Sequence, residues 1–297
     1  MPDDSWRFVK ARRMVRVDGS ASDTASMAVW THGCTMSFGS ADVVMFVARV
    51  VPVPDGLADL LTSGERVRLA AFARTGDQER FVVAHALLRL AVSDVFGVGR
   101  ERAQFDFTCS VCGLAHGRPV LLDAGSLPGS PSRFAMSLST AADRVVVGVA
   151  RSGEIGVDIE RVDDAQFTGF DAVALAENEA RALQALPESI ARFARATTWV
   201  RKEAALKASG HGLRVDPREV PVWEGEVVHT GVTRVAAAPP PVTTTGSGGL
   251  TNREADAVVR WSDVELGEAG YVAAVAHTGP EPLRITVRNG DSLLRRS

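Results

Sequence analysis

Residues 155–160 carry the clearest alternation of hydrophobic and polar positions in the chain. Side chains alternate between the two faces of a strand at about 3.3 Å per residue. One face would then carry Ile155, Val157 and Ile159, and the other Gly156, Asp158 and Glu160. The pattern therefore predicts a strand with one apolar face, and with two carboxylates roughly 7 Å apart on the other face.

A helical period follows at residues 190–209. Trp199, Glu203 and Lys207 are spaced by four and form one stripe, with Lys202 at its border. A neighbouring stripe that can face a core contains Phe193, Thr197, Val200 and Ala204. If the polar stripe packs against the acidic face of the strand, three carboxylates converge beside cationic side chains. Such a site suits a hard divalent cation that is shared with substrate phosphates.

The rest of the pattern predicts two halves with a similar order of helices and short strands. In the first half we expect strands at 43–51, 118–122, 134–139 and 145–150, and helices at 57–72, capped by Thr62 or Ser63, and at 80–95. In the second half we expect helices near 174–186 and 190–209, and strands near 219–223, 226–235, 257–261 and 270–276. Residues 1–40 have no clear period, and residues 236–250 form a low-complexity Pro/Thr/Gly loop.

Composition narrows the class of protein. The 297 residues are 45% hydrophobic and 23% charged, which is enough for a sizeable core in one or two domains. A net charge of −3 argues against a nucleic-acid binder that works through bulk basicity. No apolar run approaches the roughly 20 residues needed to span a bilayer, and the first residues lack an apolar signal core. With only 3 cysteines a disulfide framework is not expected. We therefore expect a cytoplasmic protein without a membrane or nucleic-acid partner.

Two motifs together are far more specific than either alone. Gly156-Val-Asp-Ile-Glu160, followed about forty residues later by Trp199-Val-Arg-Lys-Glu-Ala-Ala-Leu-Lys207, resembles the 4′-phosphopantetheinyl transferases of the surfactin-synthetase type. Taken separately, alternating acids on a strand and Glu–Lys neighbours on a helix are usually solvated surface charges. Both motifs match without a gap, and the resemblance extends over residues 43–276.

The resemblance implies an α+β fold. Two pseudo-symmetric halves are expected, each a short antiparallel sheet packed with helices, with the active site in the cleft between them. The expected divisions are a poorly defined N-terminal extension (1–40), a coenzyme A-binding half (41–152), a half with the metal and catalytic motifs (153–277) and a C-terminal tail (278–297).

The resemblance also implies the roles of the site residues. Asp158, Glu160 and Glu203 would hold Mg²⁺, which accepts oxygen ligands and keeps water and phosphate in its shell. A zinc site is not expected there, because neither motif contains His or Cys. Glu203 would act as the catalytic base, while Lys207 and Lys202 would stabilise the charge that develops as the bridging oxygen leaves.

Coenzyme A is the second implied ligand. The residues implied to bind it are Arg68, Arg80, Arg118, Ser139, Thr140, Asp158 and Lys207. Arg118 stands in a Gly-Arg-Pro element whose cation would meet the 3′-phosphate, since a guanidinium can donate two parallel bonds. The alternative for Arg118 is an exposed turn residue.

One position departs from the family pattern. The family commonly has Ser-His in the strand before the carboxylate motif, whereas this chain has Ser139-Thr140. Both residues offer only uncharged donors to a phosphate. We expect weaker coenzyme A binding, or compensation by a neighbouring cation such as Arg144.

The resemblance implies an enzyme that transfers the 4′-phosphopantetheine arm of coenzyme A to a serine of an apo acyl or peptidyl carrier protein. It would release 3′,5′-ADP and act as a monomer, because both half-sites lie on one chain. Residues 165–195, including Phe167 and Phe170, are candidates for contact with the carrier. The alternatives are a non-catalytic regulator that binds coenzyme A or a carrier protein, and a metal-dependent phosphohydrolase.

A separate cluster lies in the predicted turn before Arg118. Cys109, Cys112 and His116 offer three zinc ligands, and a fourth would have to come from far away, for instance Cys34. The alternative is a pair of reduced thiols that pack a turn. The sequence leaves both possibilities open.

Overall fold

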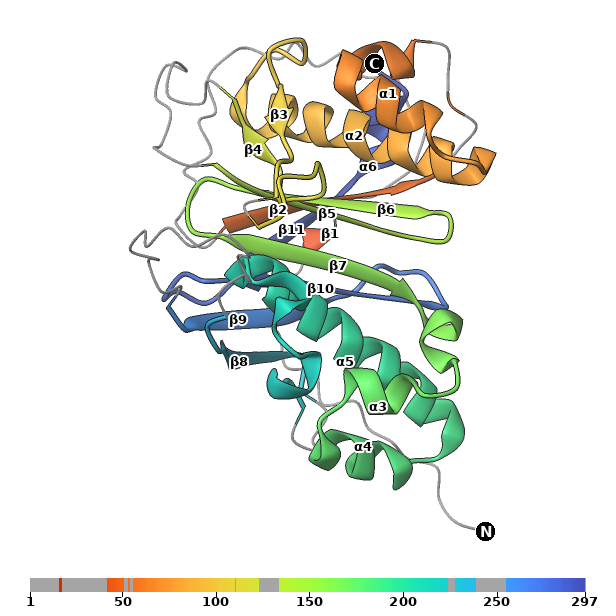
Figure 1. Ribbon diagram of the computed structural model, residues 1–297, viewed down its shortest axis with the longest axis vertical. Helices are drawn as coiled ribbons and strands as arrows, with labels where there is room; N and C mark the ends of the chain where they lie inside the picture. The colour runs from red at the N-terminus through yellow and green to blue at the C-terminus, as the bar shows by residue number, and fades with distance from the viewer. Residues whose placement is uncertain are drawn as a thin grey trace, which may run out of the picture.

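The computed structural model describes residues 16–17, 42–50, 53, 56–109, 111–122, 134–223, 228–238 and 255–296. The fold is α+β, as the sequence predicts. Figure 1 shows layers in which two sheets lie against each other, with helices α1, α2 and α6 outside one sheet and α3, α4 and α5 outside the other. No helix in these ranges has the length and apolar character that a membrane span requires.

The first sheet has the order β1-β11-β2-β6-β5. Its strands are β1 (Arg16–Val17), β11 (Arg284–Asn289), β2 (Asp42–Arg49), β6 (Arg144–Ala150) and β5 (Ala135–Ala141). The β2–β6 and β6–β5 pairs are antiparallel, as expected, but β11 runs parallel to both β2 and β1. The sheet is therefore mixed.

The C-terminal segment is not a tail, so the expectation for residues 278–297 is wrong. The whole of strand β11 pairs with β2, from Asp42 to Val47, and the short helix α6 (Gly290–Leu294) follows it directly. Ile285, Leu293 and Leu294 are buried. Residues 16–17 also pair with β11, so the predicted extension 1–40 contains at least one element of the sheet. The rest of that extension lies outside the described residues.

Helix α2 (Thr75–Phe96) covers the outer face of the first sheet. It follows a short 3₁₀ helix, η1 (Leu57–Leu60), and helix α1 (Ser63–Ala70). Of the two predicted caps of α1, Thr62 is the one observed: its hydroxyl accepts from the Glu65 N–H, and its own N–H donates to the Glu65 carboxylate. The hairpin of β3 (Phe105–Asp106) and β4 (Val120–Leu121) carries the Cys/His loop.

The second sheet has the order β7-β10-β9-β8 and is antiparallel throughout. Its strands are β7 (Ile155–Arg161), β10 (Tyr271–His277), β9 (Ala257–Val264) and β8 (Thr230–Val235). The long helix α5 (Glu188–Ser209) packs across it. Between β7 and α5 lie η3 (Val162–Gln166), α3 (Phe170–Ala174) and α4 (Glu177–Gln184).

Two expectations in the second half concern the strand near 219–223 and the loop 236–250. The strand predicted near 219–223 is absent, because η5 (Pro217–Glu219) is followed by an irregular segment. Val220, Val222 and Trp223 are nevertheless buried, and Pro221 cannot donate to a ladder, so the apolar run fills a core without joining a sheet. Of the predicted loop 236–250, the structure describes 236–238, where Ala238 is buried, and the remainder lies outside the described residues.

The inner faces of the two sheets share one apolar core. Met45 and Val146 of the first sheet pack there with Val157, Ile159 and Val275 of the second. The apolar face predicted for residues 155–160 is therefore the face that joins the halves, and the acidic face points away from this core.

Candidate active site

The acidic face of β7 lies directly beneath α5. Gly156 allows this approach, because a Cβ atom at this position would overlap the carbonyl oxygen of Ala204 and crowd the N–H of Ala208. The absence of a side chain thus sets the distance between strand and helix. It also places the polar stripe of α5 beside Asp158 and Glu160.

Lys207, Asp158 and Ser139 form a hydrogen-bonded cluster. Lys207 Nζ lies 2.6 Å from Asp158 Oδ1 and donates to Ser139 Oγ at 3.1 Å and to the Val157 carbonyl at 3.2 Å. The Ser139 hydroxyl donates to the same carboxylate oxygen at 2.7 Å. Ser139 comes from β5 of the first sheet, whereas Asp158 and Lys207 belong to the second half. The cluster therefore spans the two halves of the molecule.

Asp158 Oδ2 has a different environment from Oδ1. The Asp158 side chain is only 4% exposed, and Oδ2 is buried without a hydrogen-bond partner among the described residues. A buried carboxylate oxygen without a partner is costly unless a further group, such as a cation, neutralises it. Asp158 is thus held through one oxygen and has the other available as a ligand.

The two neighbouring glutamates are affected by the same charge. Burial and, to a smaller extent, repulsion from Asp158 raise the pKa of Glu160 to about 7. A hydrogen bond from Trp199 opposes this shift. Burial and then repulsion from Asp158 also raise the pKa of Glu203 to about 6, with Lys207 opposing the shift. The site therefore concentrates more negative charge than Lys207 balances, which is the condition that favours binding of a cation.

The donor set fits a hard oxygen-binding ion. Asp158, Glu160 and Glu203 supply only carboxylate oxygens, and Asp158 Oδ2 is unpartnered. The oxygen atoms of these three carboxylates are not all within 4.8 Å of one another. Among the described residues, the group that meets this distance is Cys109, Cys112 and His116. Mg²⁺ tolerates such a spread because it usually keeps water and phosphate ligands.

The expectation that Lys202 faces this cluster is wrong. Its side chain is fully buried on another side of α5, where Nζ lies 2.5 Å from Glu179 Oε2 and donates to the Pro217 carbonyl at 2.8 Å. Burial lowers the pKa of Lys202, although the Glu179 carboxylate opposes this shift. Lys202 ties α5 to α4 and to η5, so its role is structural.

Glu179 is a residue that the sequence analysis missed. Besides Lys202 it accepts hydrogen bonds from the N–H groups of Val222 and Ala176. Its only sequence signal is its place three residues after Ala176, the N-cap of α4, where a glutamate commonly caps the helix. Phe193, predicted to face a core, is instead 50% exposed, whereas Val200 and Ala204 of the same stripe are buried.

Arg118 lies beside the C-terminal end of α5. It donates to the carbonyls of Lys207 and Ala208 at 3.3 Å and pairs with Glu154 at 3.1 Å. Its guanidinium also lies against Gly210, the residue that ends the helix. Arg118 therefore contacts the backbone of Lys207, and its side chain is 39% exposed.

The other residues expected to bind coenzyme A are more dispersed. Thr140 is exposed on the edge strand β5, next to Ser139. Arg80 donates to the Ala142 carbonyl just beyond it and pairs with Asp77. The Arg68 guanidinium lies over the ring of Phe81, 5.1 Å from its centroid. Neither arginine contacts the Asp158 cluster.

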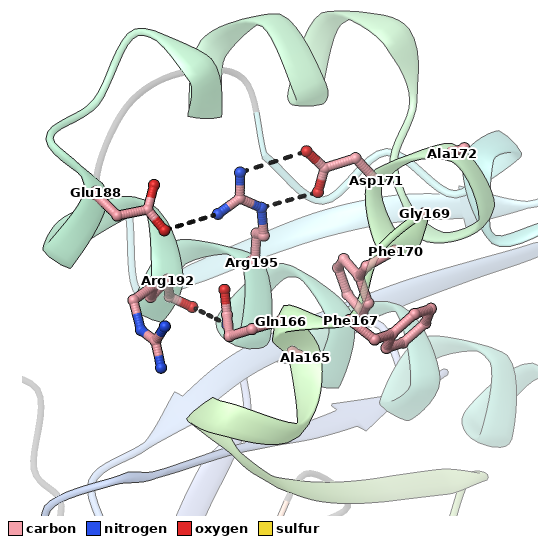
Figure 2. Close-up of a pocket in the computed structure, with 10 residues that line it drawn as sticks. All are labelled: Ala165, Gln166, Phe167, Gly169, Phe170, Asp171, Ala172, Glu188, Arg192 and Arg195. Carbon is pink, nitrogen blue, oxygen red and sulfur yellow. Dashed lines mark hydrogen bonds and ion pairs between the residues drawn. The ribbon is translucent and has the colours of Figure 1, made fainter.

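A surface hollow of about 450 Å³ lies between η3, α3 and the start of α5. In Figure 2, Phe167 and Phe170 lie close together at one side of it, and Arg195 lies between Asp171 and Glu188. Phe167 is 57% exposed. The hollow lies within the segment expected to contact a carrier protein.

A family model matches the segment of the chain that carries these motifs. Residues 154–276 match the family model of the 4′-phosphopantetheinyl transferase superfamily. This segment contains β7 and α5, and therefore Asp158, Glu160, Glu203 and Lys207. A comparison with curated proteins gives no match.

Proposed function

We propose that this protein transfers the 4′-phosphopantetheine arm of coenzyme A to a serine of an apo acyl or peptidyl carrier protein, in a Mg²⁺-dependent reaction that releases 3′,5′-ADP. The observation that carries the proposal is the packing of α5 on β7. This packing brings Glu203 and Lys207 to Asp158 and Glu160, within the segment that matches the transferase superfamily.

Asp158, Glu160 and Glu203 would hold the Mg²⁺ ion. When bound, the ion supplies charge neutralisation for the pyrophosphate and holds it in position. The raised pKa values of Glu160 and Glu203 and the unpartnered Asp158 Oδ2 support this assignment. Burial and then repulsion from Asp158 raise these pKa values, and a divalent cation would offset both effects.

Glu203 is the proposed general base. A serine hydroxyl is a weak nucleophile at neutral pH and needs a base to accept its proton. Glu203 is the carboxylate in place to accept that proton, because it lies beside Asp158 and Lys207 in this cluster. As the proton passes to Glu203, the serine oxygen forms a bond to the β-phosphorus, and the bond to the bridging oxygen breaks.

Lys207 is proposed to stabilise the leaving group. The bridging oxygen leaves with its electron pair as part of 3′,5′-ADP, and an ammonium group beside it lowers the energy of the developing charge. Lys207 Nζ is held by Asp158, Ser139 and the Val157 carbonyl, so its position is fixed before substrate binds. Lys202 has no part in this role, because it is buried against Glu179.

The residues that we propose to bind coenzyme A are Arg118, Arg80, Arg68, Ser139 and Thr140. Arg118 is the best placed of the three arginines, because its side chain donates to the carbonyl groups at the end of α5, the helix that carries Lys207. A guanidinium that is 39% exposed can exchange Glu154 for a 3′-phosphate at little cost. The hollow beside Phe167 and Phe170 is the proposed contact for the apolar part of the carrier's surface (Figure 2).

The decisive experiment is incubation of the pure protein with an apo carrier protein, coenzyme A and Mg²⁺. Mass spectrometry of the carrier should show addition of the phosphopantetheine group to one serine. A carrier Ser→Ala variant should remain unmodified. If several apo acyl and peptidyl carriers all stay unmodified, the proposal is wrong.

One observation favours a second function. Thr140 replaces the histidine that the family commonly has, and its exposed hydroxyl gives coenzyme A no charged partner. A non-catalytic regulator would bind coenzyme A or a carrier without chemistry. Binding of either ligand without any modified carrier would favour this second function, and turnover of coenzyme A without a carrier would indicate a phosphohydrolase.

A further inference from the structure

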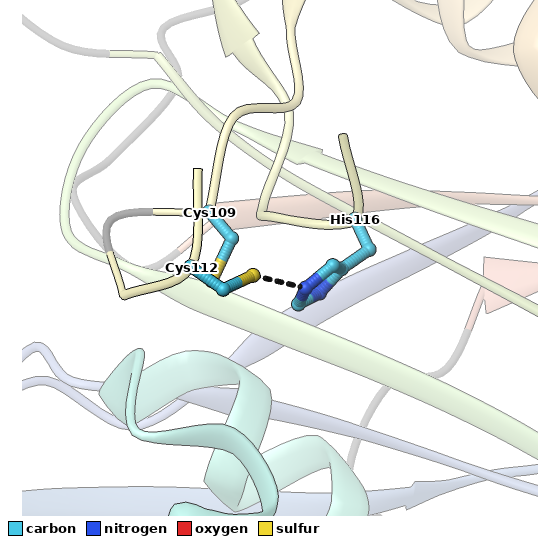
Figure 3. Close-up of side chains that lie close together, drawn as sticks. All are labelled: Cys109, Cys112 and His116. Carbon is cyan, nitrogen blue, oxygen red and sulfur yellow. Dashed lines mark hydrogen bonds between the residues drawn. The ribbon is translucent and has the colours of Figure 1, made fainter. Parts of the chain in front are cut away.

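Three side chains with metal-binding atoms meet in the loop between β3 and β4. The atoms of Cys109, Cys112 and His116 that can bind a metal all lie within 4.8 Å of one another. Figure 3 shows both thiols and the imidazole directed toward one point, with Cys112 Sγ 2.8 Å from His116 Nε2. The proposed transferase reaction assigns no role to this cluster.

The distances suit a tetrahedral ion after a small movement. Zinc binds thiolate sulfur at about 2.3 Å and imidazole nitrogen at about 2.0 Å, so a tetrahedral site separates such atoms by about 3.6 Å. The observed Sγ–Nε2 distance of 2.8 Å is shorter than this. A shift of less than about 1 Å converts one arrangement into the other.

The turn that follows Cys109 brings the sulfur atoms of Cys109 and Cys112 within 4.8 Å of each other. Gly113 then adopts a left-handed conformation, with a φ of 70°, and its N–H donates to the Cys109 carbonyl at 2.9 Å. This turn is tight enough to require glycine, and it directs both sulfurs to the same side.

Hydrophobic packing does not explain why this loop is ordered. Val111 and Leu114 are 38% and 65% exposed, and both Cys112 and His116 are exposed. The loop is closed instead by hydrogen bonds, from the Cys109 N–H to the Leu114 carbonyl at 2.8 Å and from the Gly117 N–H to the Phe107 carbonyl at 2.6 Å. Short loops with so little buried apolar surface are commonly stabilised by a bound metal.

We propose that Cys109, Cys112 and His116 bind a structural zinc ion that fixes the β3–β4 loop. Soft thiolates with one imidazole select zinc over Mg²⁺, so this site is chemically distinct from the carboxylate cluster. These three side chains supply three ligands, and water completes the tetrahedron.

The position of the loop links the zinc site to Arg118. His116 is followed by Gly117 and then by Arg118, which contacts the end of α5. A side chain at Gly117 would come within 2.7 Å of the Thr108 carbonyl oxygen, so the chain is tightly confined between the zinc ligands and Arg118. Zinc binding would therefore hold Arg118 in place.

The test measures metal directly and does not depend on the transferase activity. Tag-free protein, purified under reducing conditions without chelators, should contain about one zinc ion per chain. Cys109→Ser, Cys112→Ser and His116→Ala should each lower zinc affinity by at least roughly tenfold. His229→Ala is the matched control, because this exposed histidine pairs with Asp263 in the other half and should leave the zinc content unchanged.

Cobalt provides a second readout that needs no variant. Wild-type protein loaded with Co²⁺ should show a thiolate-to-cobalt charge-transfer band and the visible bands of a tetrahedral ion. The inference is overturned if the wild-type protein binds neither zinc nor cobalt when loaded with stoichiometric metal. It is equally overturned if the cysteine variants retain the wild-type metal content.

The consequence for Arg118 rests on the proposed function and has its own readout. Removal of zinc should raise the Michaelis constant for coenzyme A several-fold with a smaller change in kcat, as Arg118→Ala should also do. A wild-type protein that binds zinc but modifies no carrier would disprove the transferase proposal and leave the zinc site standing. A transferase whose Michaelis constant is unchanged by zinc removal would disprove only the link to Arg118.

Discussion

Lys207 Nζ lies 2.6 Å from Asp158 Oδ1 and so connects the last turns of α5 to the middle of β7. The same carboxylate oxygen accepts from Ser139, which leaves Asp158 Oδ2 without a partner in the described structure. One oxygen of Asp158 is thus used to hold the site together, and the other is available to a ligand.

Asp158→Ala should lower the rate of phosphopantetheine transfer by at least roughly a hundredfold, because it removes the central metal ligand and the partner of Lys207. The fold should survive, since Lys207 is 27% exposed and can be hydrated. The rate is measured by mass spectrometry of the carrier, and the fold by circular dichroism. Asp59→Ala, at an exposed acid on η1, is the control. Near-normal rates at saturating coenzyme A and Mg²⁺ would contradict the metal assignment.

The metal-free protein should become less stable as pH rises through about 6 to 7. Glu160 and Glu203 have pKa values of about 7 and 6 in the folded protein and 4.5 as the ordinary value. A raised folded-state pKa means that the folded protein holds protons that the unfolded chain has released. The corresponding stability is complete below the ordinary pKa and is lost as pH rises through the folded values.

Thermal unfolding across this pH range tests the prediction. The melting temperature should fall by on the order of a few degrees between about pH 5 and pH 8 without Mg²⁺. Mg²⁺ should restore stability more at the higher pH, since it binds the ionised carboxylates. A Glu160→Gln/Glu203→Gln double variant should flatten the dependence. An unchanged slope in that variant would mean that other groups cause it.

Lys202→Met should destabilise the protein without damaging the chemistry. Removing one partner of a buried ion pair leaves Glu179 uncompensated and costs roughly 3–5 kcal/mol. Chemical denaturation should show this loss, while kcat of the folded protein should stay within about twofold of the wild type. Adding Glu179→Gln should recover part of the stability. A large fall in kcat with normal stability would restore Lys202 to the catalytic group.

Thr140→His should lower the Michaelis constant for coenzyme A several-fold. A charge-assisted bond to phosphate is typically worth about 1.5–3 kcal/mol, against roughly 1 kcal/mol for a neutral hydroxyl donor. Thr140 is exposed on an edge strand, so the imidazole can be accommodated. A nearby phosphate raises the pKa of a histidine, and the gain should therefore be larger at about pH 6 than at about pH 8.

Thr140→Gln is the matched control, because it adds a donor of similar reach without charge. It should change the Michaelis constant less than the histidine does. If Thr140→His binds coenzyme A no better at either pH, the position does not face a phosphate.

The sequence by itself determined the local elements of the candidate site. Alternation over residues 155–160 predicted strand β7 and its acidic face. The spacing of Trp199, Glu203 and Lys207 predicted helix α5 and the polar stripe that faces β7. These predictions succeeded because periods of 2 and 3.6 residues arise from the local geometry of the backbone. The capping of α1 by Thr62 and Glu65 could be predicted for the same reason, since all its partners lie within four residues.

Only the tertiary structure decided which side chains of α5 face the carboxylates. Lys202 and Glu203 are neighbours in sequence, yet Lys202 is buried against Glu179 while Glu203 interacts with Asp158. A helical period gives the angle between the two residues but not which partner each will meet. Likewise, the sequence does not reveal that β11 belongs to a sheet, because its partner β2 lies more than 200 residues away along the chain. Such pairing depends on long-range contacts, which no local pattern contains.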